Sequence, residues 1–172
     1  MDLFMLSLRL AAYFRVAKDC CGTEMSCCYH QFIAQKPIEL CFAEGDNQWR
    51  NATICAEKAL NTSKSVQDDL DICCYYLTPE ECKLDCLRSL RAPTLDGNAK
   101  MSFTERCEQY STTANPFSCV ARRQTLAHEC FPNCLRLGRK YNPLEDCPGL
   151  KENDDWCIGD EVPRSEIPIA KT

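Results

Sequence analysis

The chain contains 172 residues, of which 16 are cysteine, and its formal net charge is −5. This acidic balance argues against a nucleic-acid-binding protein, whose binding domain is usually basic. No uncharged apolar run approaches the roughly 18 residues that indicate a transmembrane helix. A cysteine share of about 9% is typical of a disulfide scaffold, and disulfides persist in oxidising compartments such as the extracellular space.

The N-terminal segment is apolar but interrupted by charges. Asp2, Arg9 and Arg15 break the stretch, so its longest uncharged run is Leu3 to Leu8. A secretory signal needs a longer apolar core after a positive start. We therefore favour an internal amphipathic helix over a poor signal peptide, and expect the chain to be a piece of a longer secreted protein.

The cysteines repeat along the chain. Two sets of six each begin with an adjacent pair, and a set of four follows. We predict that all are oxidised and that bridges stay within residues 20–55, 73–119 and 130–157, with the pairing inside each set left open. The two members of an adjacent pair should bond to different elements, because a bridge between neighbours is strained. The sixteen residues are Cys20, Cys21, Cys27, Cys28, Cys41, Cys55, Cys73, Cys74, Cys82, Cys86, Cys107, Cys119, Cys130, Cys134, Cys147 and Cys157.

Zinc binding is the alternative use of so many cysteines. Zinc sites favour closely paired Cys-x2-Cys ligands or added histidine. The chain has no such pair, and its only histidines are His30 and His128. Asn51 and Asn61 each begin an Asn-x-Ser/Thr sequon in a stretch that we expect to be rich in loops, so we predict both to be glycosylated. Disulfides in an extracellular or cell-surface protein are the favoured interpretation.

The segments between the cysteines predict short helices. Ser65 is expected to begin a helix that carries Cys73 and Cys74, and residues 78–81 (Thr-Pro-Glu-Glu) form a predicted capping box with proline at the first helical position. In the helix that follows, Cys82, Cys86 and Leu90 share one face. Residues 102–105 form a second predicted box, and residues 115–116 begin a helix that contains Cys119. Pro93, Gly97 and Asn98 mark a loop. Strand-like alternation is missing, so we predict an all-α fold of small disulfide-rich helical modules in tandem.

The cysteine sets define the predicted organisation. We expect an N-terminal segment, a divergent first six-cysteine module, a second six-cysteine module, a four-cysteine tail module and a flexible tail, at residues 1–19, 20–72, 73–124, 125–157 and 158–172.

Positive charge concentrates in the second half of the chain. Residues 83–140 contain ten basic and five acidic side chains, whereas the flanking regions are each acidic. The plain interpretation is solvated helix faces. The alternative is a basic patch for an acidic partner, formed by Arg88, Arg91, Arg122, Arg123, Arg136 and Arg139. Of these, we predict that partner binding involves Arg88, Arg91, Arg122 and Arg123, bordered by Leu87, Leu90, Phe117 and Phe131.

No catalytic constellation is visible in the sequence. The motifs of serine hydrolases, zinc proteases and phosphate-binding loops are missing. His128 lies two residues before Cys130, but a cysteine in a disulfide is no nucleophile. We therefore predict a protein that is not an enzyme and that has no cofactor or metal.

The cysteine spacing resembles that of a known family. The run from Cys73-Cys74 through Cys82 and Cys86 to Cys107 and Cys119, followed by Cys130-x3-Cys134, is similar to the last cysteine-knot (CC) repeats of the RECK family, the reversion-inducing cysteine-rich proteins with Kazal motifs. The match covers about residues 41–147. The first module departs from the pattern at Cys27-Cys28, and no Kazal module is recognisable.

The resemblance implies a glycosylated cell-surface protein held by a GPI anchor, although no GPI signal is recognisable in this chain. It implies two activities, which are restraint of matrix metalloproteinases and co-reception of Wnt ligands together with a receptor. An unrelated secreted disulfide-rich effector and a metal-storing cysteine protein are the alternatives.

Overall fold

The computed structural model describes residues 3–110 and 119–147, and for residues 119–127 it describes the backbone alone. Every regular element in these ranges is a helix, which confirms the predicted all-α class. The α-helices are α1 (Leu3–Cys21), α2 (Met25–Ile33), α3 (Gln48–Leu60), α4 (Glu80–Leu90), α5 (Gly97–Met101), α6 (Phe103–Tyr110), α7 (Cys119–Leu137) and α8 (Pro143–Asp146). The 3-10 helices are η1 (Gly22–Glu24), η2 (Glu39–Cys41), η3 (Leu70–Tyr76) and η4 (Gly138–Lys140).

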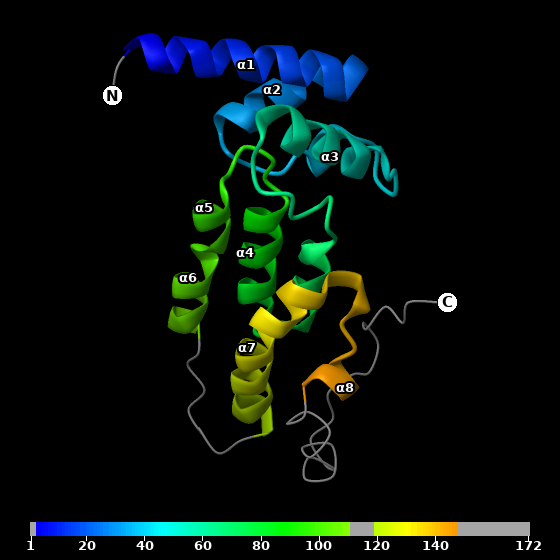
Figure 1. The fold of residues 1–172 in the computed structure, drawn as a ribbon, viewed down its shortest axis with the longest axis vertical. Helices are drawn as coiled ribbons and strands as arrows, with labels where there is room; N and C mark the ends of the chain where they lie inside the picture. The colour runs from blue at the N-terminus through cyan, green and yellow to red at the C-terminus, as the bar shows by residue number, and fades with distance from the viewer. Residues whose placement is uncertain (1–2, 111–118, 148–172) are drawn as a thin grey trace.

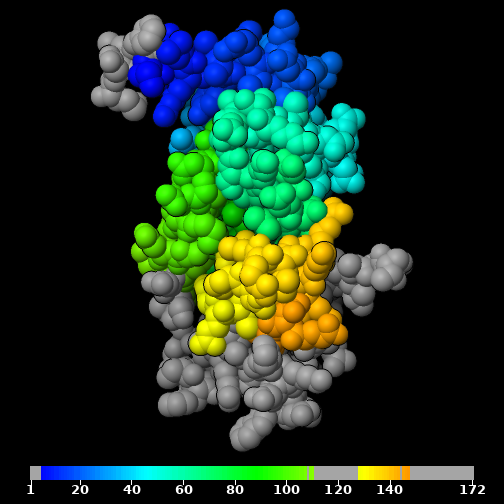
Figure 2. Space-filling model, viewed as in Figure 1, coloured from blue at the N-terminus to red at the C-terminus, as the bar shows by residue number. Residues whose placement is uncertain are grey.

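The molecule is elongated and has two cores. Helices α1 to α3 lie across one end, and α4 to α8 fill the rest of the long axis (Figure 1). The space-filling view shows the first helices at one end of the molecule and α7 and α8 farther along the long axis (Figure 2). We call residues 3–60 the N-terminal half and residues 70–147 the C-terminal half, because each contains one cluster of buried apolar side chains.

Three disulfides hold the N-terminal half together. Cys20–Cys55 joins α1 to α3, Cys21–Cys28 joins α1 to α2, and Cys27–Cys41 joins α2 to η2. Phe32 and Ala56 are fully buried between these helices. All three bridges stay inside the predicted range 20–55, and the adjacent pair Cys20-Cys21 reaches two different helices.

The first helix packs only through its C-terminal part. Val16, Ala17 and Cys21 are buried against α2 and α3, whereas Met5 and Leu8 in its first turns are exposed. The predicted N-terminal helix is therefore present. None of the helices in the described part of the chain combines the length and the apolarity that crossing a membrane requires.

Four disulfides hold the C-terminal half together. Cys74–Cys86 joins η3 to α4, Cys82–Cys107 joins α4 to α6, and Cys130–Cys147 ties α7 to the end of α8. The predicted stripe on α4 is confirmed, because Cys82, Cys86 and Leu90 are all buried in this core. Phe103 and Phe131 pack edge-to-face there, with ring centroids 5.5 Å apart.

The fourth bridge, Cys73–Cys134, corrects the predicted partition. It links η3 to α7 and so joins the second cysteine set to the set of four, which makes the prediction of separate bridging within 73–119 and 130–157 wrong. The reason is packing. Helix α7 presents Phe131 and Cys134 to the same core as Cys73 and Cys74, so residues of the predicted second and tail modules share one interior. As predicted, Cys73 and Cys74 bond to different elements.

Several predicted helix starts differ from the structure. Pro79 precedes α4 as its extended N-cap residue, and no side chain caps this helix, so the predicted box is wrong. The helix begins at Glu80, one residue later than predicted, so Pro79 and not Thr78 occupies the N-cap position, and proline has no side-chain group that could cap. Ser102 precedes α6, but its hydroxyl donates to the Ala99 carbonyl 2.8 Å away. Ser65 begins a run of turns and not a helix, and Cys73 and Cys74 lie on the 3-10 helix η3.

The predicted loop near residue 97 is also shorter than expected, since Gly97 and Asn98 belong to α5. Here the cap is Asp96, whose Oδ1 accepts the Ala99 N–H at 2.8 Å. The predicted helix start at residues 115–116 lies outside the described residues.

Candidate functional site

Polar side chains connect the two halves, and Asp71 lies at the centre of one such group. Asp71 belongs to η3 and its side chain is 1% exposed. Its Oδ2 accepts from Arg91 Nε at 2.9 Å and from Arg50 Nη1 at 3.1 Å. Since a buried carboxylate needs charged partners, the two arginines make this burial possible. Arg50 comes from α3 and Arg91 follows α4, so Asp71 fixes the N-terminal half against the C-terminal half.

Arg91 makes a second connection between the halves. Its Nη1 donates to Glu39 Oε1 at 2.9 Å, and its Nη2 donates to the Tyr75 hydroxyl at 3.1 Å. The guanidinium also lies over the Trp49 ring, 4.8 Å from its centroid. Burial acts to lower the pKa of Arg91, but the charges of Glu39 and Asp71 outweigh it and raise the pKa. The group is therefore a fixed cation held between two carboxylates and two aromatic rings.

Arg50 connects the same network to residues that come later in the sequence. It also contacts Asp69, and its Nη2 donates to the Val66 carbonyl at 3.2 Å. Asp69 in turn accepts from Arg139 Nη2 at 3.0 Å. Desolvation opposes the charge of Arg50, but its bonds with Asp71 and Asp69 give a net rise in its pKa. The network therefore reaches from α3 to η4.

A separate ion pair is completely buried. Lys100 Nζ lies 2.7 Å from Glu57 Oε1, and the two side chains are 1% and 0% exposed. Lys100 also donates to the Ser63 carbonyl at 3.1 Å, while the Glu57 carboxylate accepts the backbone N–H groups of Val66 and Gln67. Burial lowers the pKa of Lys100, and the charge of Glu57 opposes this shift. Each ion thus has hydrogen-bond partners besides its counter-ion, as a buried pair requires.

The Arg91 group opens onto the surface through aromatic and aliphatic side chains. Leu40, the neighbour of Glu39, is 89% exposed, and Tyr75 is 41% exposed. Lys83 adds a cation 5.9 Å from the centroid of the Tyr75 ring. Tyrosine, tryptophan and arginine are the residues enriched where partner proteins bind most strongly. We call Trp49, Tyr75 and Arg91, together with Leu40 next to Glu39 in the chain, the aromatic–arginine face. Its polar groups are already fixed, so a partner would meet a pre-organised surface.

The predicted basic patch is distributed among different environments. Arg91 is mostly buried in the network, Arg139 pairs with Asp69, and Arg136 donates to Asn133 Oδ1 at 2.7 Å. Arg88 is 70% exposed and lies 3.5 Å from Asp85. The side chains of Arg122 and Arg123, and residue Phe117, lie outside the described side chains.

The apolar border expected beside these arginines is wrong for two residues. Leu90 and Phe131 are 2% and 6% exposed and belong to the core. The apolar character of Leu90 and Phe131 correctly indicated burial. The sequence alone did not show whether these residues lie in the core or at the edge of a binding surface.

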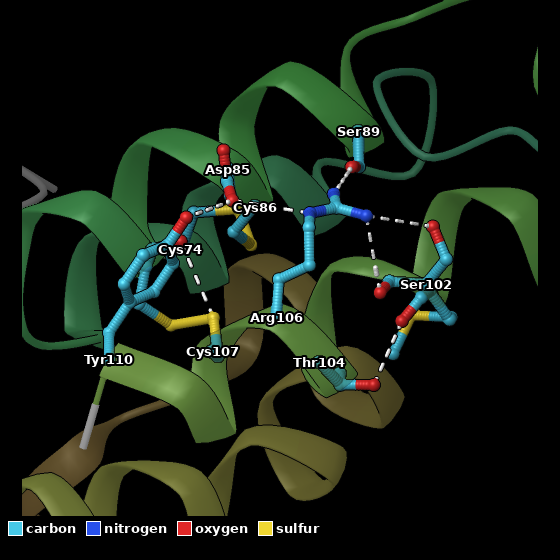
Figure 3. The surroundings of a disulfide bond; sticks show 11 residues. Cys74, Asp85, Cys86, Ser89, Ser102, Thr104, Arg106, Cys107 and Tyr110 are labelled. Carbon is cyan, nitrogen blue, oxygen red and sulfur yellow. Dashed lines mark hydrogen bonds and ion pairs between the residues drawn. A yellow bond between two sulfur atoms is a disulfide. The ribbon is translucent and has the colours of Figure 1, made fainter.

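Asp85 organises a smaller polar cluster on α4. Its Oδ2 accepts from Arg106 Nε at 3.2 Å and from the Tyr110 hydroxyl at 3.1 Å, beside the Cys74–Cys86 bridge (Figure 3). The hydrogen bond to Asp85 raises the pKa of Tyr110. Figure 3 shows Arg106 reaching from α6 toward Ser89 of α4, so this cluster connects two helices of the same half.

The two sequons lie in different local structures. Asn51 is exposed in the first turns of α3, so the expected loop is wrong at this position. Asn61 is exposed directly after α3, in the left-handed region with φ 52°. All cysteines among the described residues form disulfides, and Cys157 and the side chain of Cys119 lie outside the described part.

His30 is exposed on α2, and His128 is partly exposed on α7. Within residues 3–110 and 119–147, no group of three or more potential ligand side chains is placed to hold a metal ion. Asp71, Trp49 and Glu39 were not predicted as site residues. The sequence offers a signal for Asp71 alone, which is an acid two residues before the Cys73-Cys74 pair. Comparisons with protein-family models, with curated proteins and with solved structures found no match for this chain.

Proposed function

We propose that this chain is an extracellular, cell-surface module that acts by binding other proteins. The observation that carries the proposal is the complete pairing of the described cysteines in seven disulfides, which fits an oxidising compartment. The bridges and the ionic network fix the helices, so the molecule offers rigid surfaces. Rigid surfaces favour binding because little conformational entropy is lost.

The proposed binding surface is the aromatic–arginine face. Its exposed Leu40 and Tyr75 supply apolar area, and Arg91 holds Tyr75 through a hydrogen bond to the hydroxyl. By the family resemblance, the proposed partners are matrix metalloproteinases or a Wnt ligand with its receptor. Exposed Arg88, together with Arg122 and Arg123, is a second proposed contact whose contribution would depend on salt.

A matched pair of tyrosines tests the surface. Tyr75 and Tyr110 are 41% and 37% exposed, and each makes a side-chain hydrogen bond. They lie on η3 and α6, with α4 packed against both (Figure 1). We expect Tyr75→Ala to weaken binding by about ten-fold or more, a hot-spot effect, and Tyr110→Ala to leave it unchanged. The measurement is surface plasmon resonance of the full chain against an immobilised metalloproteinase catalytic domain and a Wnt ligand.

The outcomes separate the hypotheses. Equal losses for both variants, or none for Tyr75→Ala, would remove this face from the proposal. Charge reversal of Arg122 and Arg123 to Glu, measured at two salt concentrations, tests the second contact. Binding to neither partner class would leave an unrelated secreted disulfide-rich effector as the alternative, which the same disulfide pairing supports.

A further inference from the structure

The two sequons become enclosed by different parts of the chain. Asn51 and Asn61 are only ten residues apart, and both side chains are exposed in the finished fold. A sequon is recognised through its asparagine and through the hydroxyl two residues later. The accessibility of Thr53 and Ser63 therefore decides when each site is open to the glycosylating enzyme.

The first sequon lies within a helix of the N-terminal half. Thr53 is fully buried, and its hydroxyl donates to the Trp49 carbonyl at 2.8 Å. The helix that carries it is fastened to α1 by the Cys20–Cys55 bridge. Its helix neighbours Ala52 and Ala56 pack in the N-terminal core, so folding of this half would hold Thr53 in α3 with its hydroxyl engaged before the C-terminal half exists.

The second sequon keeps its Ser63 hydroxyl partly exposed beside Ser65, and the segment that carries it is fastened by residues that come much later. Thr62 Oγ1 donates to the Pro93 carbonyl at 2.7 Å, and the Ser63 carbonyl accepts from buried Lys100. At about 5–20 residues per second, the chain from Cys55 to Lys100 takes about 2–9 s to synthesise. Disulfide formation begins on the scale of seconds. N-terminal folding therefore has time to close the first sequon while the second is still open.

We propose that Asn61 is the main N-glycosylation site of this chain and that Asn51 is modified only in the fraction of chains that have not yet formed the Cys20–Cys55 bridge. Folding of the N-terminal half and glycan transfer compete at Asn51 but not at Asn61. This inference rests on the proposed extracellular function in one respect, since it needs passage through the secretory pathway.

Translation of the full chain into microsomes, behind an added cleavable signal, tests the proposal. Asn61→Gln reports on Asn51 alone, and Asn51→Gln reports on Asn61 alone, each read as the glycosidase-sensitive gel shift. We expect partial modification of Asn51 that rises about two-fold or more when a reductant is present during synthesis, and high modification of Asn61 that does not change.

Bridge variants supply the matched control. Cys20→Ser with Cys55→Ser should raise Asn51 modification as the reductant does, whereas Cys130→Ser with Cys147→Ser removes a bridge of the other half and should not. As a second measurement, the oxidised, unglycosylated Asn61→Gln chain should be a poor acceptor, and its reduced and alkylated form a good one. Full modification of Asn51 without reductant, or an equal response to both bridge variants, would overturn the proposal. If neither sequon is modified in any arm, the proposal is overturned as well. Counting the free thiols of the native chain would still test the extracellular proposal separately.

Discussion

The two halves are closed by disulfides in different ways. In the N-terminal half, the three bridges connect residues separated by 35, 7 and 14 positions. In the C-terminal half, one bridge spans 61 positions and draws the last long helix onto the first core elements. Between the halves, the described contacts include no disulfide and are formed by ion pairs such as Arg91–Glu39 and Lys100–Glu57. Covalent closure therefore organises each half, and electrostatic pairing sets how the described halves meet.

Because ion pairs join the halves, we expect the junction to be sensitive to the loss of a single charge. Lys100→Met should destabilise the chain by about 3–5 kcal/mol, because it leaves buried Glu57 without its counter-ion. Urea unfolding followed by far-UV circular dichroism measures this. The double variant with Glu57→Gln should recover part of the loss, and a loss below about 1 kcal/mol for the single variant would show that the pair does not hold the junction.

Removing bridges one at a time sharpens the comparison within the C-terminal half. In the chain-entropy model, Cys73→Ser with Cys134→Ser should lose about 4 kcal/mol, and Cys74→Ser with Cys86→Ser about 3 kcal/mol, because the longer loop restricts the unfolded chain more. Unfolding midpoints of both double variants give the ranking. The reverse order would indicate that native-state packing, and not loop length, dominates.

Arg91→Lys tests whether geometry or charge matters at the junction. Lysine keeps the charge but cannot bond to Asp71, Glu39 and Tyr75 together. We expect a loss of about 1.5–3 kcal/mol, the size of a charge-assisted hydrogen bond, together with weaker partner binding through a less fixed Tyr75. Arg9→Lys, at an exposed position of α1 outside both proposed contacts, is the control and should change neither quantity. Equal behaviour of the two variants would contradict the assignment.

The smallest effect concerns pH. Burial raises the pKa of Tyr76 and of Tyr141, whose rings meet edge-to-face at 5.3 Å. A folded-state pKa above the unfolded value means that stability is complete below the unfolded pKa, near 10, and falls as pH rises through the folded one. Stability measured by urea unfolding at pH 9 and at pH 10.5 should decrease, and Tyr76→Phe should reduce that decrease. An unchanged slope in the variant would assign the alkaline loss to other groups.

The sequence predicted local features better than long-range ones. Helix class and the Cys82–Leu90 stripe follow from periodicity within a few residues, and the divergence of adjacent cysteines follows from bond geometry. The Cys73–Cys134 pairing could not be predicted, because the number of cysteines in each set does not show which helices share a core. Arg91 was expected at the surface since its charge is visible in the sequence, whereas Asp71, Glu39 and Trp49 come together only through tertiary packing.

The placement of the bridges also determines how the molecule would respond to tension, such as that between a cell and its surroundings. Force applied across α1 and α7 would pass through Cys20–Cys55 and then Cys73–Cys134, which shield the residues inside each loop. Between these two bridges, the segment from Cys55 to Cys73 lies in the force path without covalent protection. Those residues, 56–72, could extend to roughly 60 Å at about 3.5 Å each. Under load, the bridges would keep each half from extending. The short segment between the halves would extend once the ion pairs that join them break.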